Sequence, residues 1–164
     1  MEQSTDSLLK DVIGPELYSK LENTPQSAKW HPEGNAKNHT ILVMENVLEW
    51  PFATEEEEQT MMACAIFHDL GKIDTTKVCP DGKITSYGHE EASLRYLKEL
   101  DESLAVHFPQ VDPNEVKEIV ANHMRAHLYN NGNMSNPQKR KAFKEKKSFP
   151  QIMLFAEFDS NGKG

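Results

Sequence analysis

Apolar residues recur at helical spacing along this chain, and several of the apolar stripes end in a histidine or an aspartate. Residues at positions i, i+3, i+4 and i+7 share one face of a helix. Met61 and Ala65 share a face with His68, and Ile66 shares one with Asp69. Because such stripes must face a core, His68 and Asp69 are predicted to point inward from the end of one helix.

Two other predicted helices carry the same feature. Phe155 and Ala156 share a stripe with Asp159, and His39 lines up with Val43. An inward carboxylate costs free energy unless something pairs with it. Alone, an inward histidine is more often a hydrogen-bonded core residue, and an inward aspartate could pair with an arginine.

Four such residues on stripes from three helices favour a different interpretation. Carboxylates that converge from different helices repel each other unless a cation lies between them. Two imidazoles and two carboxylates form a mixed nitrogen and oxygen set that suits a divalent transition metal. The predicted metal ligands are His39, His68, Asp69 and Asp159.

The same periodicity predicts an all-α fold. Helices are expected at about 37–50, 54–70, 89–106, 113–128 and 149–160, with a short basic helix at 136–146 and a weaker pattern before residue 25. Thr54 and Glu57 form a capping box, and Gly71 is expected to end the second of these helices. The sequence around Pro80 predicts a turn, with a small hairpin near residues 77–86. We expect one domain over residues 1–164, a bundle of about six to seven helices.

Composition excludes several classes of protein. No run approaches the roughly 18 apolar residues of a membrane helix. The first residues lack the basic and apolar regions of a signal peptide, so a cytoplasmic protein is expected. The only cysteines, Cys64 and Cys79, are too few for a cysteine metal site and are expected to be free thiols. The sequence carries no signal for an oligomeric state.

The formal charge of −8 at pH 7 argues against binding to extended DNA. It leaves room for a small phosphorylated substrate or a nucleic-acid end. Residues 139–147 are a local exception, with six basic residues and one glutamate. This stretch could face a substrate or form a solvated helix face, and the solvated face is the favoured interpretation.

Further histidines follow the helical rule. His123 and His127 continue the stripe of Val116 and Val120, and His89 begins another helix. His89 and His123 could form a second metal site or a phosphate-binding wall, or could be ordinary core histidines. His127 and His107 are expected to be peripheral, with His127 kept as a candidate substrate contact.

The string His68-Asp69-Leu70-Gly71-Lys72 resembles the signature of HD-domain phosphohydrolases. In that family an upstream histidine and a distant aspartate complete the metal site, and here they map to His39 and Asp159. The segment WHPEGNAKNHT at 30–40 and the triplet Gly-His-Glu at 88–90 are similar to one branch of the family. That branch comprises the HD domains of CCA-adding tRNA nucleotidyltransferases and those fused to polynucleotide kinases in RNA end-healing enzymes.

The resemblance covers about residues 29–162 and implies an HD-domain helical bundle. It further implies a divalent metal (Mn, Ni, Co, Mg, Fe or Zn) and hydrolysis of phosphoesters at a nucleotide or RNA terminus. The bonds implied are those of 2′,3′-cyclic phosphates and of 2′- or 3′-phosphomonoesters. Neither a nucleotidyltransferase part nor a P-loop is present, and residues 130–148 match nothing in the pattern. The chain ends five residues after Asp159, as a fragment or a minimal enzyme would.

Each candidate residue has a hypothetical role in catalysis or binding. The metal would polarise phosphoryl oxygens and activate a water, which Asp69 would orient and help to deprotonate. Lys72 could contact phosphate, or could simply be a cation near a helix end. His89 and His123 would bind phosphate, protonate the leaving group or hold a second metal. His31 and Glu33 could line the pocket, where His31 would contact substrate, although Glu33 could equally be a turn residue.

Two other functions compete with RNA-end hydrolysis. One is a phosphohydrolase acting on a deoxynucleoside monophosphate, a cyclic mononucleotide or an alarmone. The other is a catalytically silent module that binds a nucleotide without turnover. A helical adaptor is disfavoured, because it would not need inward histidines and aspartates.

Overall fold

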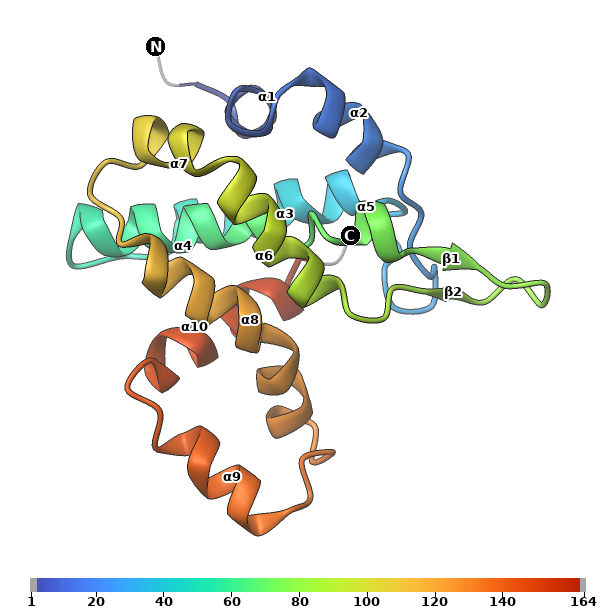
Figure 1. Ribbon diagram of the computed structural model, residues 1–164, viewed down its shortest axis with the longest axis vertical. Helices are drawn as coiled ribbons and strands as arrows, with labels where there is room; N and C mark the ends of the chain where they lie inside the picture. Colours follow the sequence, from blue (N-terminus) through green and yellow to red (C-terminus); the bar gives the residue numbers. More distant parts are fainter. Residues whose placement is uncertain (1–2, 163–164) are drawn as a thin grey trace.

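A computed structural model describes residues 3–162, and its long elements are all helices (Figure 1). The all-α prediction is confirmed, and the predicted hairpin pairs Lys77 with Thr85 and Val78 with Ile84. The elements are α1 (Thr5–Ile13), α2 (Pro15–Glu22), α3 (Ala36–Glu49), α4 (Glu55–Phe67), α5 (Lys72–Thr75), β1 (Lys77–Val78), β2 (Ile84–Thr85), α6 (His89–Glu99), α7 (Asp101–His107), α8 (Pro113–Asn130), α9 (Pro137–Lys144) and α10 (Phe149–Ser160).

The described helices are shorter and more numerous than the six or seven expected. Gly14, with φ of 88°, separates α1 from α2, because glycine adopts this conformation without steric cost. Leu100 leaves the helical conformation and divides the helix expected at 89–106 into α6 and α7. Single-residue breaks of this kind leave the apolar spacing on either side unchanged, so periodicity does not detect them.

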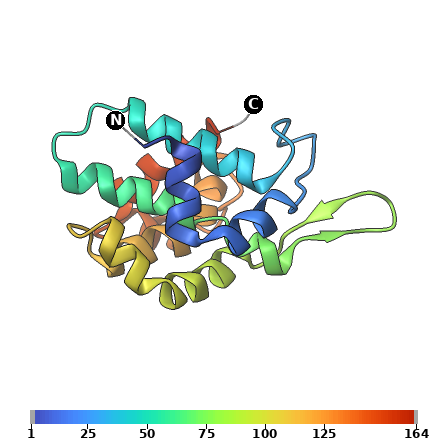
Figure 2. The same ribbon diagram turned by 90° about the horizontal axis from the view of Figure 1, so that it is seen from above.

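Helix α4 lies at the centre of the bundle. Its residues from Thr60 to Phe67 are all buried, and α3, α6, α8 and α10 pack against it. A helix that is apolar on every side needs neighbours on every side. Figure 2 shows the hairpin extending away from the helices of the bundle. The end of α4 is therefore held rigidly where the candidate site begins.

Gly71 has a different role from the one predicted. Its backbone is right-handed helical, with φ of −62°, and not the left-handed conformation of a helix-ending glycine. A Cβ atom at this position would lie 2.1 Å from the carbonyl oxygen of His89 and 2.6 Å from the backbone nitrogen of Ser93. Ser93 Oγ accepts a hydrogen bond from the Gly71 N–H and donates one to the carbonyl of His68. Glycine is needed here because the turn after α4 packs directly against α6.

The last part of α8, α9 and the start of α10 form an arm, defined here as residues 125–149, which extends from the bundle at the bottom of Figure 1. A small aromatic cluster holds the arm together. It consists of Tyr129, Phe143 and Phe149, and the ring centroids of each pair are 5.6 Å apart. The basic helix predicted at 136–146 is confirmed as α9. Within the described residues, no helix has the length and apolar character to cross a membrane.

Candidate metal centre

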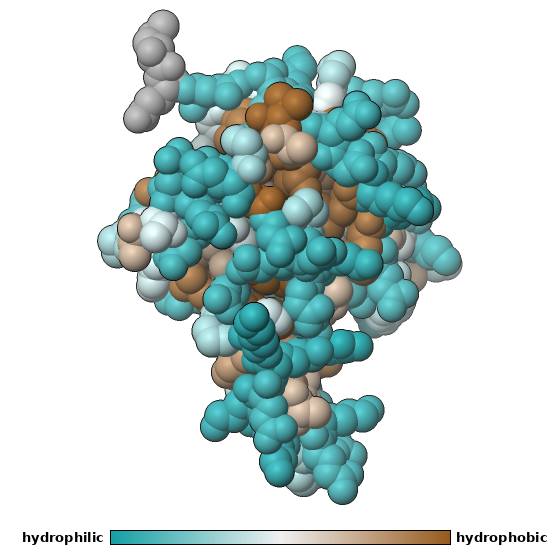
Figure 3. Space-filling model, turned by 60° about the vertical axis from the view of Figure 1, so that its left-hand side comes forward, coloured by the Kyte–Doolittle hydropathy of each residue, from teal (hydrophilic) through white to brown (hydrophobic). Residues whose placement is uncertain are grey.

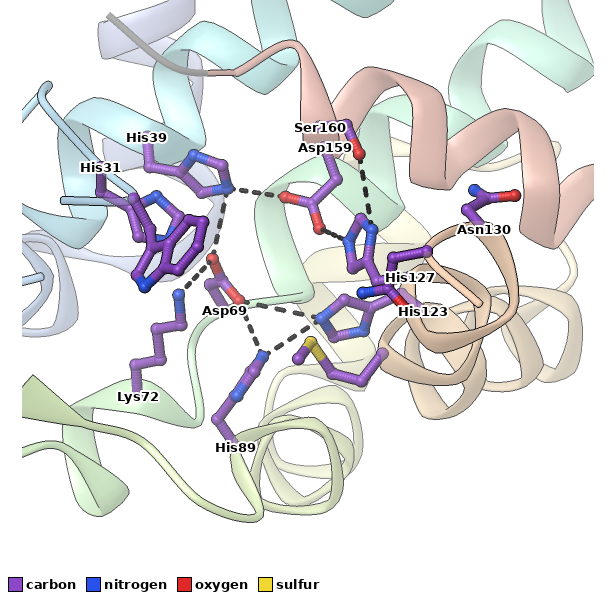
Figure 4. A pocket seen from close by; sticks show the side chains of 13 residues that line it. His31, His39, Asp69, Lys72, His89, His123, His127, Asn130, Asp159 and Ser160 are labelled. Atoms are coloured by element: carbon purple, nitrogen blue, oxygen red, sulfur yellow. Dashed lines mark hydrogen bonds and ion pairs between the residues drawn. The ribbon is translucent and has the colours of Figure 1, made fainter. Parts of the chain in front are cut away.

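The four predicted ligands come together from two helices, α3 and α10, and from the turn after α4, which carries both His68 and Asp69. His39 Nε2 lies 2.7 Å from Asp159 Oδ1, and His68 Nε2 lies 3.2 Å from the same oxygen. Asp69 Oδ2 is 3.1 Å from His68 Nε2 and 3.5 Å from His39 Nε2. One nitrogen or oxygen of each residue lies within 4.8 Å of the others. Figure 4 shows three of the four, His39, Asp69 and Asp159. This spacing can hold one metal ion.

All four side chains are buried, so their charges strongly perturb one another. Burial disfavours the charged form of His68, but Asp69 and Asp159 outweigh it and raise the pKa of His68 to about 10. Burial likewise opposes the ionised carboxyls, yet the neighbouring His68 holds the pKa values of Asp69 and Asp159 well below the usual range. The centre thus keeps two carboxylates charged by placing positive charge between them, which is the place a metal cation would take.

The histidine rings of the centre share one hydrogen-bonding pattern. In each, Nδ1 lies within hydrogen-bonding distance of a backbone carbonyl, so Nε2 is directed toward the carboxylates. A carbonyl partner at the far nitrogen fixes the ring orientation and the tautomer of a metal-ligating histidine. The pairs are His39 with Gly162 (2.7 Å), His68 with Ala65 (2.8 Å), His89 with Ser86 (3.1 Å) and His123 with Val120 (2.6 Å).

A second cluster shares Asp69 with the first. Asp69 Oδ1 lies 3.1 Å from His89 Nε2 and 3.9 Å from His123 Nε2, and the two nitrogens are 3.2 Å apart. Burial, together with the nearby charge of His68, lowers the pKa of His123 to about 3. His123 is therefore neutral near pH 7 and keeps a lone pair available. The two oxygens of Asp69 face different nitrogen groups, as a carboxylate between two cations would.

Lys72 and His127 complete the charged surroundings. Lys72 Nζ lies 3.2 Å from Asp69 Oδ2 and donates to Gln26 Oε1, so its ammonium group is buried beside the carboxylates. His127 is nearer the centre than expected, because its Nε2 lies 2.6 Å from Asp159 Oδ2. One helical turn separates His127 from His123, so the stripe already contained this signal. His107 is peripheral as expected and contacts Ser103 on α7.

The segment before α3 forms the rim. His31 Nδ1 lies 2.9 Å from Glu33 Oε1, which is also 3.2 Å from His39 Nδ1. Glu33 therefore contacts a histidine of the centre and is more than a turn residue. Burial, with the charge of Lys72, lowers the pKa of His31.

The centre opens into a pocket of about 470 Å³, a volume that suits one nucleotide. Besides the residues above, it is lined by Trp30, Met124, Asn130, Asn131 and Ser160. Trp30 is 59% exposed, which is unusual for a tryptophan. Sequence reasoning did not single out these five as site residues. Helical spacing contained a signal for two of them, since Ser160 lies four residues after Ala156 and Asn131 four residues after His127.

Comparison with known proteins agrees with this geometry. The model of the HD domain family matches residues 37–148. A multifunctional CCA protein from Mannheimia succiniciproducens is 33% identical over 119 residues, which cover 72% of this chain and 26% of the relative. The corresponding protein from Pasteurella multocida is 36% identical over 90 residues, or 54% of this chain and 20% of its own length. The one from Shewanella frigidimarina is 31% identical over 108 residues, 66% of this chain and 22% of the relative. The chain spans about a quarter or less of these relatives.

Proposed function

We propose, from the premise that this chain belongs to the HD domain family of metal-dependent phosphohydrolases, that it cleaves phosphoester bonds at the ends of RNA. The bonds would be those of 2′,3′-cyclic phosphates, of 2′- or 3′-phosphomonoesters, or of both. The observation that carries this proposal is the set of Nε2 atoms turned toward Asp69 and Asp159 at the base of a nucleotide-sized pocket. Such a set suits a metal and leaves an open side for a phosphoryl group.

The donor atoms fit a divalent metal. His39, His68, Asp69 and Asp159 would hold it, and His89 with His123 and the second oxygen of Asp69 would hold another if two are bound. Imidazole and carboxylate donors suit Mn, Fe, Co, Ni and Zn, whereas Mg prefers oxygen donors. The metal would supply Lewis-acid polarisation of the phosphoryl oxygens.

The protein's own residues would position the reacting groups. Asp69 faces both nitrogen clusters and would orient the attacking water and accept its proton. Lys72, buried beside Asp69, would give a phosphoryl oxygen a fixed positive charge. Because His123 is neutral, it suits a ligand or acceptor better than a proton donor. With one metal bound, His89 would protonate the leaving oxygen, since its Nε2 lies between Asp69 and His123 and would be free of metal.

Two observations support an RNA terminus as the substrate. Trp30 and His31 belong to the segment that resembles the RNA-processing branch, and both line the pocket. An exposed indole at a pocket rim can stack on a nucleobase. The similar proteins from three bacteria are all named multifunctional CCA proteins, which supports the same branch.

The test is hydrolysis by EDTA-treated protein reloaded separately with Mn, Ni, Co, Mg and Zn. Substrates are 2′,3′-cAMP, 2′-AMP, 3′-AMP, a 5′-deoxynucleoside monophosphate, ppGpp and bis(p-nitrophenyl) phosphate. Activity restored by one metal, and strongest on the cyclic or 2′-phosphorylated nucleotide, is the expected result. Preference for the 5′-monophosphate or for ppGpp would instead identify the protein as a phosphohydrolase of those nucleotides. Metal binding without any turnover would indicate a nucleotide-binding module instead.

A further inference from the structure

A second cavity, of about 550 Å³, lies between the end of α8, the loop at 131–136 and α9. We call it the basic pocket. No acidic residue is among the described residues that line it. Its polar lining consists of cations and groups that can donate hydrogen bonds, mainly Arg125, Lys139, Lys146, Asn133 and Asn136.

The charge of the chain is divided unevenly. Residues 125–147 contain seven basic residues and one acidic residue, a net charge of +6. The whole chain carries −8, so the remaining residues carry −14. The part of the arm that surrounds the basic pocket is therefore positive against a strongly acidic body. Figure 3 shows the lower lobe of the molecule, which includes α9, with a mainly hydrophilic surface.

Several cations of the arm are committed to other contacts. Arg140 lies over the Tyr129 ring and donates to backbone carbonyls, Lys141 lies 3.9 Å from Glu145, and Lys146 lies 3.4 Å from Glu118. Within the described residues, Arg125 and Lys139 line the pocket without an ion pair to a carboxylate. Among the described residues, the Arg125 side chain donates one hydrogen bond, to the amide oxygen of Asn122, which leaves most of its five donors available to a ligand.

The basic pocket adjoins the pocket of the metal centre. Met124 lines the metal-centre pocket and Leu128 lines the basic pocket, and they are one turn apart on the same face of α8. Four residues correspond to a rise of about 6 Å along a helix. The loop continues this arrangement, because Asn131 lines the first pocket and Asn133 the second. A strand whose end lies at the metal centre would reach the basic pocket within a few nucleotides.

We infer that the basic pocket binds the backbone phosphates of the RNA strand on the 5′ side of the terminus that the metal centre processes. Arg125 and Lys139 make the principal contacts, and Lys146 contributes while sharing its charge with Glu118. This inference rests on the proposed function and extends it, because it makes an RNA strand a better substrate than a mononucleotide. An acidic protein would also be attracted to these cations, but it would produce no dependence on strand length.

The test compares 2′,3′-cAMP with a pentanucleotide that ends in a 2′,3′-cyclic phosphate, using the metal-loaded enzyme. Neutralisation of three phosphates should lower kcat/KM for the pentanucleotide about 20-fold between 50 and 200 mM salt, from a slope of about −0.7 per single-strand contact. The double variant Arg125→Glu, Lys139→Glu should reduce that salt effect to about threefold. It should lower kcat/KM for the pentanucleotide at least about 10-fold at 50 mM salt and leave 2′,3′-cAMP hydrolysis unchanged.

Lys98→Glu, Lys117→Glu is the matched control, since it also reverses two exposed cations that form no ion pair within the described residues. Its pentanucleotide rate should stay close to that of the wild type. Equal rates on the two substrates, or equal losses in the two double variants, would overturn the inference. If neither substrate is hydrolysed, the proposed function has failed. The basic pocket is then tested separately, by measuring the binding of a labelled 3′-phosphorylated pentanucleotide through its fluorescence anisotropy. Weaker binding only in the Arg125, Lys139 variant supports the basic pocket, and unchanged binding overturns it.

Discussion

The metal centre and the arm both include part of α8, but their charged side chains lie in opposite environments. At the metal centre, His123 and its neighbours are buried on the most tightly packed helices, and each charge faces an opposite charge. In the arm, Arg125 and Lys139 are exposed, and no carboxylate pairs with them in the described chain. The first region holds its charges buried among oppositely charged partners, and the second presents its charges to solvent.

This difference matches two separate tasks. Buried, preorganised charges act strongly on a reacting phosphoryl group because they do not have to reorganise. Exposed cations bind a phosphate backbone through counterion release. The affinity then depends little on the exact position of each cation and strongly on the salt concentration. Chemistry at the metal centre should therefore depend on single atoms, whereas strand binding by the arm should depend on the number of charges.

The largest effect is expected for Asp159→Ala. Asp159 contacts His39, His68 and His127, so its loss removes a candidate ligand and the partner of several rings. The rate on 2′,3′-cAMP and on the pentanucleotide should fall equally, by at least about 10³-fold, or about 4 kcal/mol. Steady-state kinetics and metal content by mass spectrometry measure the two consequences.

The double variant of the arm is the control for this prediction. The Arg125→Glu, Lys139→Glu variant should retain its full metal content and lose rate only on the pentanucleotide. Circular dichroism should show unchanged helix content in both proteins. If the Asp159→Ala protein kept its metal and its rate, the ligand set would be wrong.

The two regions also differ in how much the sequence reveals. His68, Asp69 and Asp159 could be predicted to meet because a buried carboxylate is too costly without a partner, so helical phase alone locates it. No such constraint applies to Lys139, because an exposed lysine on a solvated helix carries no desolvation cost in any orientation. The sequence therefore left the basic stretch open between two interpretations.

The fold shows the same division. The long helices follow from apolar spacing, and Thr54 caps α4 as its side-chain chemistry predicts. The break at Leu100 and the role of Gly71 were missed. The role of Gly71 depends on how α6 packs against the turn after α4, which is information that no local stretch of sequence contains. The break at Leu100 leaves the apolar spacing on either side unchanged, so periodicity does not detect it.

The next effect compares Gly71→Ala at the metal centre with Gly132→Ala in the arm. At Gly71 the new methyl would meet two backbone atoms of α6 at 2.1 and 2.6 Å, so α6 and His89 must move. The free energy of unfolding should fall by about 3 kcal/mol. At Gly132 nothing lies within 4 Å of the new Cβ, and only the φ of +81° is unfavourable for a side chain. Gly132→Ala should therefore lower the free energy of unfolding by about 1–2 kcal/mol.

Urea denaturation followed by circular dichroism measures both glycine variants, and metal affinity adds a second readout. Only Gly71→Ala should weaken metal binding, because only this change moves His89 against Asp69. Equal losses of stability with unchanged metal affinity would mean that the turn after α4 adapts to the methyl without moving α6.

The smallest effect separates the shape of the arm from its charge. Arg140 lies 4.3 Å from the centre of the Tyr129 ring and donates to the carbonyl of Met134, whereas Lys141 is exposed beside Glu145. Arg140→Ala should lower the free energy of unfolding by about 1–2 kcal/mol, and Lys141→Ala by no more than about 0.5 kcal/mol.

These two variants each remove one positive charge from the same helix, so they should weaken the long-range attraction of the pentanucleotide equally. Any additional loss in Arg140→Ala then measures the contribution of arm geometry to the basic pocket. Hydrogen exchange of the α9 amides should report faster opening in Arg140→Ala alone. If that opening occurs while pentanucleotide kcat/KM matches that of Lys141→Ala, the arm binds RNA through its charge and needs no fixed pocket.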